Sequence, residues 1–172
     1  MYVPAVIARV LTWNLKHGRA VPSAGRDLFD EFAGALAGWE WDVALLQEVP
    51  PWWPAPLAAR LHAEQRLVLT SRNAALPLRR AIAKRWPDLI KSNGGGANAI
   101  LVRGDTITEH RSRRLCIWPE RRWVHAVRLH GAGIWVANTH WNRYTAIAAR
   151  RARTRKPLRI CSWRRGAGIR LA

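Results

Sequence analysis

Four short polar fragments, each at the end or the start of an apolar run, constrain this sequence more than any other feature. The fragments are Thr12-Trp13-Asn14, Leu46-Gln47-Glu48, Gly96-Ala97-Asn98 and Asn138-Thr139-His140. The runs beside them are rich in aliphatic and β-branched residues, which is typical of buried strands. The pattern therefore predicts interior strands that carry Asn14, Glu48, Asn98 and His140 to the margin of a sheet.

The remaining segments predict an α/β fold with a mixed sheet. The expected strands cover residues 6–13, 42–46, 66–70, 99–103, 107–115, 122–129 and 133–139. The expected helices cover residues 28–39, 57–62 and 76–86, the last of them basic. The first strand is expected to be buried, and the run 42–46 to be covered on both faces. The glycine-containing link 130–133 predicts an antiparallel pair.

Charge is distributed unevenly along the 172 residues, whose formal net charge is +18. Residues 1–141 contain 19 Lys and Arg and all 11 acids, whereas residues 142–172 contain 10 Lys and Arg and no acid. The excess predicts attraction to polyanions, nucleic acid included. We expect residues 1–141 to form the domain and residues 142–172 to be an Arg-rich tail outside the native fold.

Each of the four polar residues has a chemical and a structural interpretation. A carboxylate at the mouth of a buried strand, such as Glu48, can bind Mg²⁺, although a lone Glu there can equally face solvent. Asn14 and Asn98 can orient a phosphate or a metal-bound water, or they can form turns. His140 can donate to a phosphate oxygen, or it can simply be packed at the end of its strand. His17 is expected to be solvated or to cap a loop.

Taken in this order, the fragments resemble the endonuclease/exonuclease/phosphatase superfamily, with its deoxyribonuclease I-like fold, over about residues 6–141. The resemblance implies a partial four-layer α/β sandwich in which a mixed sheet is flanked by helices and the second sheet is incomplete. It implies a hydrolase of phosphoric esters that depends on Mg²⁺ or Mn²⁺. It also implies that Glu48 and Asn14 bind the metal, and that Asn98 and His140 bind substrate and act in catalysis.

Two fragments typical of that superfamily are missing after His140, namely a Gly-Asp-x-Asn segment and a final Asp-His. The last acid is Glu120, and Trp141 stands where a small or aliphatic residue is usual. A frameshift or truncation near residues 141–143 is one interpretation, and a genuine basic helix over 144–155 is another. A non-catalytic nucleic-acid-binding protein and a nonfunctional truncated product therefore remain alternatives to an enzyme, which would be inactive if these residues are required.

Other features narrow the class of protein. Two cysteines without paired spacing, no signal peptide and no membrane span predict a cytoplasmic protein, which we expect to be a monomer. Trp52 and Trp53 can form an exposed stacking platform, a partner surface or part of the core. Three arginines near the strand 122–129 can contact phosphate or protect a solvated edge strand, and they are Arg121, Arg122 and Arg128.

Overall fold

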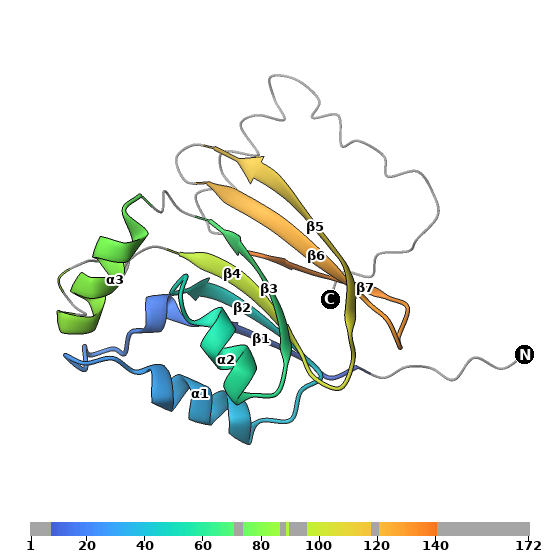
Figure 1. The fold of residues 1–172 in the computed structure, drawn as a ribbon, viewed down its shortest axis with the longest axis horizontal. Helices are drawn as coiled ribbons and strands as arrows, with labels where there is room; N and C mark the ends of the chain where they lie inside the picture. The colour runs from blue at the N-terminus through green and yellow to red at the C-terminus, as the bar shows by residue number, and fades with distance from the viewer. Residues whose placement is uncertain (1–7, 71–73, 87–88, 90–95, 118–120, 141–172) are drawn as a thin grey trace, which may run out of the picture.

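The computed structural model describes residues 8–70, 74–86, 89, 96–117 and 121–140. Helices α1 (Phe29–Gly38) and α2 (Pro54–Arg60) cover one face of a four-stranded sheet, and a three-stranded sheet covers the other face (Figure 1). Helix α3 (Leu76–Arg85) lies beyond the strand ends, at the left of Figure 1. The described residues thus form three layers of an α/β sandwich.

The first sheet has the strand order β1-β2-β4-β3 and is mixed, as expected. Its strands are β1 (Val10–Asn14), β2 (Val43–Val49), β3 (Glu64–Leu69) and β4 (Ala97–Val102). Strands β1 and β2 are parallel, whereas β4 is antiparallel to both β2 and β3. The ends of β1 and β2 and the start of β4 consequently lie at one edge of the sheet.

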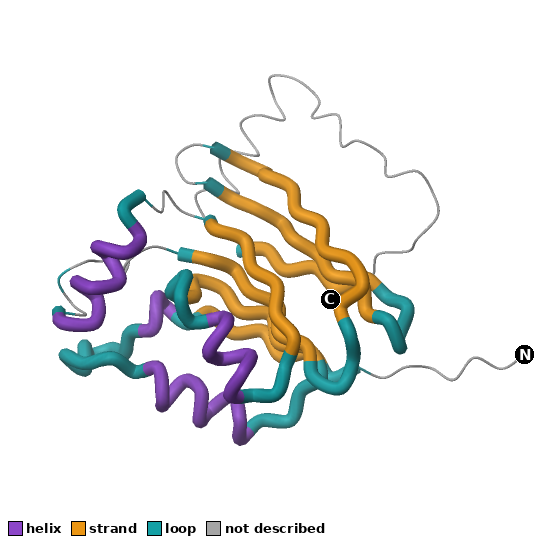
Figure 2. Tube along the Cα trace, in the orientation of Figure 1, coloured by secondary structure: helices purple, strands orange, loops and turns teal. Residues whose placement is uncertain are grey.

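The second sheet is antiparallel, with the order β5-β6-β7. Figure 2 shows the strands of both sheets in orange and the helices in purple. Its strands are β5 (Ile107–Cys116), β6 (Arg122–Leu129) and β7 (Trp135–Thr139). The predicted antiparallel pair is confirmed, since β6 and β7 pair with Val127 opposite Val136. A 3-10 turn, η1 (Lys16–Gly18), follows β1.

Two hydrophobic clusters hold the layers together, and strand alternation divides the side chains between them. On β4, Ala99 and Leu101 pack toward the helices, whereas Ile100 and Val102 pack toward the second sheet. Leu36 of α1 is fully buried in the first cluster. Burial on both faces explains why β2 and β4 read as continuous apolar runs rather than as alternating ones.

Several sequence expectations need correction. Strand β1 is an edge strand with alternating exposed residues, not a buried one, because no described strand pairs with its outer side. Strand β6 is the central strand of its sheet, and Arg122 is only 8% exposed, so a solvated edge strand is wrong there. Arg128 pairs with Glu109 at 3.0 Å.

Trp53 is buried against Phe29 and Phe32, which confirms the core interpretation for this residue. The segment 142–172 lies outside the described residues.

Candidate active site

The four predicted residues come from strand ends that meet at one end of the two sheets. We call this end, where β1, β2 and β7 finish and β4 begins, the site edge. Asn14 ends β1, Glu48 lies near the end of β2, Asn98 lies near the start of β4, and His140 directly follows β7. In Figure 1 these strand ends lie at the left, on the side of α3. The structure therefore assembles at this edge the residues that the sequence scatters over more than 120 positions.

Glu48 occupies an irregularity in β2, where the register with β4 shifts between Leu46 and Val49. Its φ of 50° lies in the left-handed region, which is unusual for a residue other than glycine. Backbone conformations of this kind are concentrated at functional sites. The shift and the left-handed turn release the Glu48 side chain from the alternation of the strand.

Two histidines flank the carboxylate of Glu48. His17 Nε2 lies 3.5 Å from one carboxylate oxygen, and His140 Nδ1 lies 3.5 Å from the other. The Glu48 side chain is 29% exposed and that of His140 only 13%. A partly buried carboxylate between two imidazoles is a polar centre with limited access to water. The expectation that His17 is merely solvated or capping is wrong.

Asn98 is the one predicted residue that the structure buries almost completely, at 1% exposure. It lies within β4, so its interpretation as a turn residue is wrong. Since Leu46 pairs with Ala99 and Val49 with Ala97, Asn98 stands across from the irregularity that holds Glu48. Neither its Nδ2 nor its Oδ1 has a hydrogen-bond partner among the described residues. Burial of an unpaired amide costs free energy, so this side chain is available for a ligand.

Asn138, beside this centre, connects the two sheets. Its Nδ2 donates to the carbonyl oxygens of Leu46 and Ala99, both at 2.9 Å, and its Oδ1 accepts from Gln47 Nε2 at 2.9 Å. The side chain is 2% exposed and all of its polar atoms are paired. It therefore holds the end of β7, and with it His140, against the irregularity in β2.

Asn14 shapes the turn that follows β1. Its Oδ1 accepts the backbone N–H of Lys16 at 2.8 Å, which is the turn-forming role. Gly18, with a φ of 71°, packs where an added Cβ would lie 2.5 Å from the ring of Trp53. Glycine alone fits this close approach to Trp53. The tight turn that it allows places His17 beside Glu48.

The donors at the site edge suit a hard cation only in part. Glu48 supplies carboxylate oxygens, and Mg²⁺ accepts one or two carboxylates while it keeps several waters. Within the described ranges, however, no group of three or more His, Cys, Asp or Glu is arranged to hold a metal ion. The residues present fit a weak, largely hydrated Mg²⁺ or Mn²⁺ and not a closed protein cage.

Comparison with solved structures identifies the architecture. An endonuclease/exonuclease/phosphatase protein from Beutenbergia cavernae superposes with a TM-score of 0.57 at 22% identity, covering 77% of this chain and 38% of that chain. The human Nocturnin catalytic domain with bound sulfate gives 0.54 at 17% identity, over 78% and 49%. A mannosyl-6-phosphatase from Bacteroides thetaiotaomicron gives 0.51 at 13% identity, over 90% and 62%.

This chain has the endonuclease/exonuclease/phosphatase fold. It spans between 38% and 62% of the length of these three structures. No protein-family model matches the sequence, and no curated protein matches it. The resemblance inferred from four short fragments is thus confirmed at the level of the fold.

Sequence reasoning missed three residues of this endonuclease/exonuclease/phosphatase-fold edge. Gln47 and Asn138 were noticed only as neighbours of Glu48 and His140, and His17 was assigned no specific role. The available signal was alternation, since Asn138 shares a face of β7 with the partly buried Val136. None of the helices in the described ranges has the length and apolar character that crossing a membrane requires.

Proposed function

We propose that this chain carries the phosphate-binding half of a metal-dependent phosphoric-ester hydrolase. The observation that carries the proposal is the buried, unpartnered amide of Asn98 across from the left-handed Glu48. A buried amide that donates to a non-bridging phosphate oxygen would recover the hydrogen bond that the protein leaves unmade. The named phosphatase and the sulfate-bound Nocturnin domain among the similar structures support the same assignment.

Each residue of the site edge has a role in this proposal. Glu48 would hold Mg²⁺ or Mn²⁺ with Asn14 nearby, and a bound cation would supply charge neutralisation at the phosphate. His140, kept in place by Asn138, would donate to a phosphate oxygen as negative charge builds up. Asn98 would orient the phosphorus for in-line attack by water.

Turnover should be slow. The Gly-Asp-x-Asn and Asp-His fragments expected from the resemblance have no counterpart among these 172 residues. The base that these fragments would supply for the attacking water is therefore missing from this sequence. The remaining groups bind and stabilise charge, which by itself still accelerates a reaction substantially in other hydrolases.

Hydrolysis of bis(p-nitrophenyl) phosphate in Mg²⁺ or Mn²⁺ tests the proposal. We expect Glu48→Gln to reduce the rate by at least about 100-fold, because the amide keeps the volume and removes the charge. Glu40→Gln is the matched control, since Glu40 pairs with Arg9 at the opposite edge and should leave the rate unchanged. Equal rates for wild type and Glu48→Gln would show that this carboxylate does not act in catalysis.

Metal binding has a readout that does not depend on turnover. With a dissociation constant of about 1 mM, about 10 mM Mg²⁺ should stabilise the fold by about 1.4 kcal/mol, because the ion binds the folded state alone. A thermal melt should show this shift for wild type and for Glu40→Gln. The same shift in Glu48→Gln would place the ion elsewhere.

A further inference from the structure

Helix α3 exposes a stripe of large apolar side chains. Leu78 and the partly buried Ile82 are four residues apart and so share one face of the helix, and Trp86 directly follows its last residue. Leu78 is 61% exposed and Trp86 is 57% exposed, and Leu89 just beyond them is 70% exposed. Tryptophan is a highly buried residue type on average, and contiguous apolar exposure marks an interaction surface.

Positive charge accompanies this stripe. Residues 74–86 contain no acid, and the next acid along the chain, Asp88, lies outside the described residues. The basic residues of α3 are Arg79, Arg80, Lys84 and Arg85. None of these four forms an ion pair among the residues that the structure describes, and Arg85 lies 5.6 Å from the ring centre of Trp86. Other described arginines have acidic partners, namely Arg9, Arg26, Arg60, Arg66, Arg111 and Arg128.

The position of α3 connects these side chains with the candidate site. The helix belongs to the link between β3 and β4, and because these strands are antiparallel the link lies where β4 starts, at the site edge. Strand β5 also ends at this edge, since β7 ends there and the sheet is antiparallel. There Leu115 is 45% and Ile117 is 59% exposed. Helix α3 and the end of β5 thus both lie toward the site edge (Figure 1), and both regions carry exposed apolar side chains.

We infer that α3 docks the site edge on an anionic phospholipid surface. A bilayer interface buries leucine and tryptophan side chains at the level of the headgroups, while anionic headgroups attract the flanking lysines and arginines. Nucleic acid would use the cations and the ring of Trp86, but it would leave Leu78 and Leu89 in water. The combination of both side-chain types is what selects the lipid surface.

Docking would hold the site edge against phosphoric esters of the membrane surface, and their role as substrates rests on the proposed function. The docking itself needs neither metal nor turnover, so it can be measured separately.

Co-sedimentation with vesicles in the presence of EDTA tests the docking. Wild-type protein should bind vesicles of equal parts phosphatidylglycerol and phosphatidylcholine and bind phosphatidylcholine alone far more weakly. The double variant L78Q/W86Q should lower the partition coefficient at least about tenfold. The control V10Q/I134Q removes a valine and an isoleucine that are 47% and 41% exposed at the opposite edge, and it should bind as wild type does.

The charge contribution has its own variant. R80Q/K84Q/R85Q should weaken binding to the anionic vesicles by about 100-fold at low salt, since each cation near such a surface contributes about fivefold. R150Q/R151Q/R153Q removes the same charge from the segment 142–172. Equal losses in the two triple variants would mean that net charge alone governs binding and would overturn the inference.

Three further outcomes would also overturn it. Vesicle binding unchanged in L78Q/W86Q would exclude the lipid surface, and a loss of oligonucleotide affinity in the same variant would assign the helix to nucleic acid. A change in its oligomeric state by light scattering would assign the stripe to a second copy of the chain. Failure of the proposed function looks different, because Glu48→Gln would leave hydrolysis unchanged while the vesicle results stood.

Discussion

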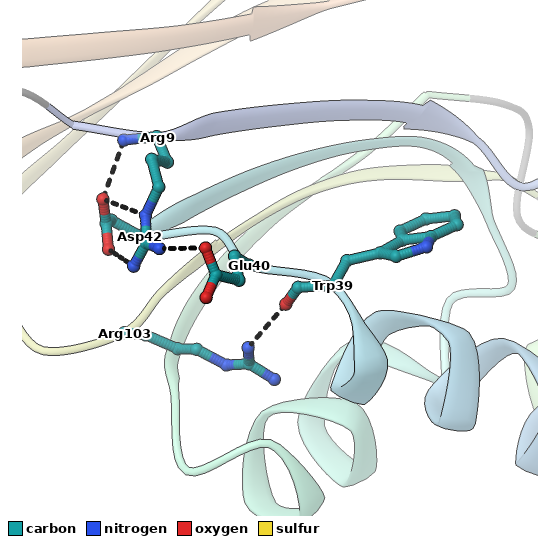
Figure 3. Close-up of polar contacts among 5 residues, drawn as sticks. All are labelled: Arg9, Trp39, Glu40, Asp42 and Arg103. Atoms are coloured by element: carbon teal, nitrogen blue, oxygen red, sulfur yellow. Dashed lines mark hydrogen bonds and ion pairs between the residues drawn. The ribbon is translucent and has the colours of Figure 1, made fainter.

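The two edges of the first sheet use polar residues in opposite ways. At the edge away from the site, Asp42 accepts from the backbone N–H of Arg9 at 2.7 Å and from its guanidinium at 3.1 Å (Figure 3). Arg103 donates to the Leu61 carbonyl oxygen at 3.2 Å and lies 3.8 Å over the ring of Trp41. Each of these charged groups has a partner within the protein.

Asp105 completes this satisfied edge. Its carboxylate accepts the backbone N–H groups of Thr106, Gly131 and Ala132, and so ties the β4–β5 turn to the β6–β7 hairpin. These bonds, that of Gly131 foremost, hold the pKa of Asp105 below its ordinary value. The bond from the Arg9 side chain does the same for the pKa of Asp42.

At the site edge, by contrast, Asn98 is buried without a partner and Glu48 has a left-handed backbone. Neither feature stabilises the fold, and both are what a ligand-binding edge requires. The two edges of one sheet thus differ in how completely their polar groups are paired, and this difference is the basis on which the site edge is proposed to be functional.

The largest effect should be on the pH dependence of stability, through His125 of β6, which stands opposite Asn138 of β7. Burial between the sheets, with a smaller effect of His110, lowers the pKa of His125 to about 3. An unfolded histidine titrates near 6.5, so the unfolded chain binds more protons between these values, and stability is lost as pH falls from about 6.5 toward 3. The loss should reach about 5 kcal/mol. Urea unfolding across this pH range measures it.

The carboxylates of the opposite edge, Asp42 and Asp105, should affect stability in a lower pH range than His125 does. Their pKa values are lowered, so the stability they contribute is present above about pH 4 and is lost only as pH falls through their folded values. Asp42→Asn should therefore leave the pH 5–7 slope unchanged, whereas His125→Gln should flatten it. A flat wild-type profile between pH 5 and 7 would contradict the assignment of His125.

Removal of the connection between the sheets should be the most damaging single substitution. Asn138→Leu leaves the carbonyl oxygens of Leu46 and Ala99 without their donor in a buried position, at a cost of about 3–4 kcal/mol. Asp105→Asn, which keeps an acceptor oxygen at a more exposed turn, should cost about 1 kcal/mol. Denaturant midpoints compare the two, and equal losses would mean that Asn138 has no special importance.

Catalysis should depend on His140 of the site edge and not on His130 of the opposite edge. His140→Gln should lower kcat/KM for a phosphodiester by about 100-fold, because a neutral amide is a weaker donor to the charge that develops on phosphate than an imidazole that can take up a proton. His130→Gln, in the exposed hairpin of the opposite edge, is the control and should act as wild type does. A fall in rate in both variants would indicate a general effect on folding instead.

The smallest effect should have the most informative sign. Asn98→Leu replaces an unpartnered buried amide by an apolar side chain of similar size and should raise the free energy of unfolding by about 1 kcal/mol while it reduces hydrolysis. Gln65→Leu is the control, because the Oε1 of Gln65 is also buried without a partner in the described part of the chain. It should stabilise the protein without loss of activity. Destabilisation by Asn98→Leu would show that Asn98 is structural.

Local patterns in the sequence were sufficient for the elements. Helical spacing predicted α1, and proline positions helped to place α2 and α3. Apolar runs and alternating segments predicted the seven strands, with boundaries displaced by at most a few residues. Placement at strand ends also selected Glu48, Asn98 and His140, which the structure brings to one edge. Their roles in metal binding and catalysis stay predictions.

Neighbour relations between strands could not be predicted in the same way. Strand β1 was expected to be buried and β6 to be an edge strand, and the long-range pairing reversed both. The position of His17 beside Glu48 follows from a turn, which leaves no periodic signal. Alternation along β7 indicates which face Asn138 occupies, but its partners on β2 and β4 follow from sheet packing alone.

The sequence by itself determined the type of each element, the α/β class and the strand-end residues, because hydrophobic periodicity and turn chemistry act over a few neighbouring positions. Only the tertiary structure decided which polar groups have partners. Asn98 and Asn138 are both asparagines in short strands, yet the side chain of Asn138 is fully hydrogen-bonded and that of Asn98 has no partner in the described residues. The physical reason is that hydrogen-bond satisfaction depends on what long-range packing places within about 3 Å of each atom.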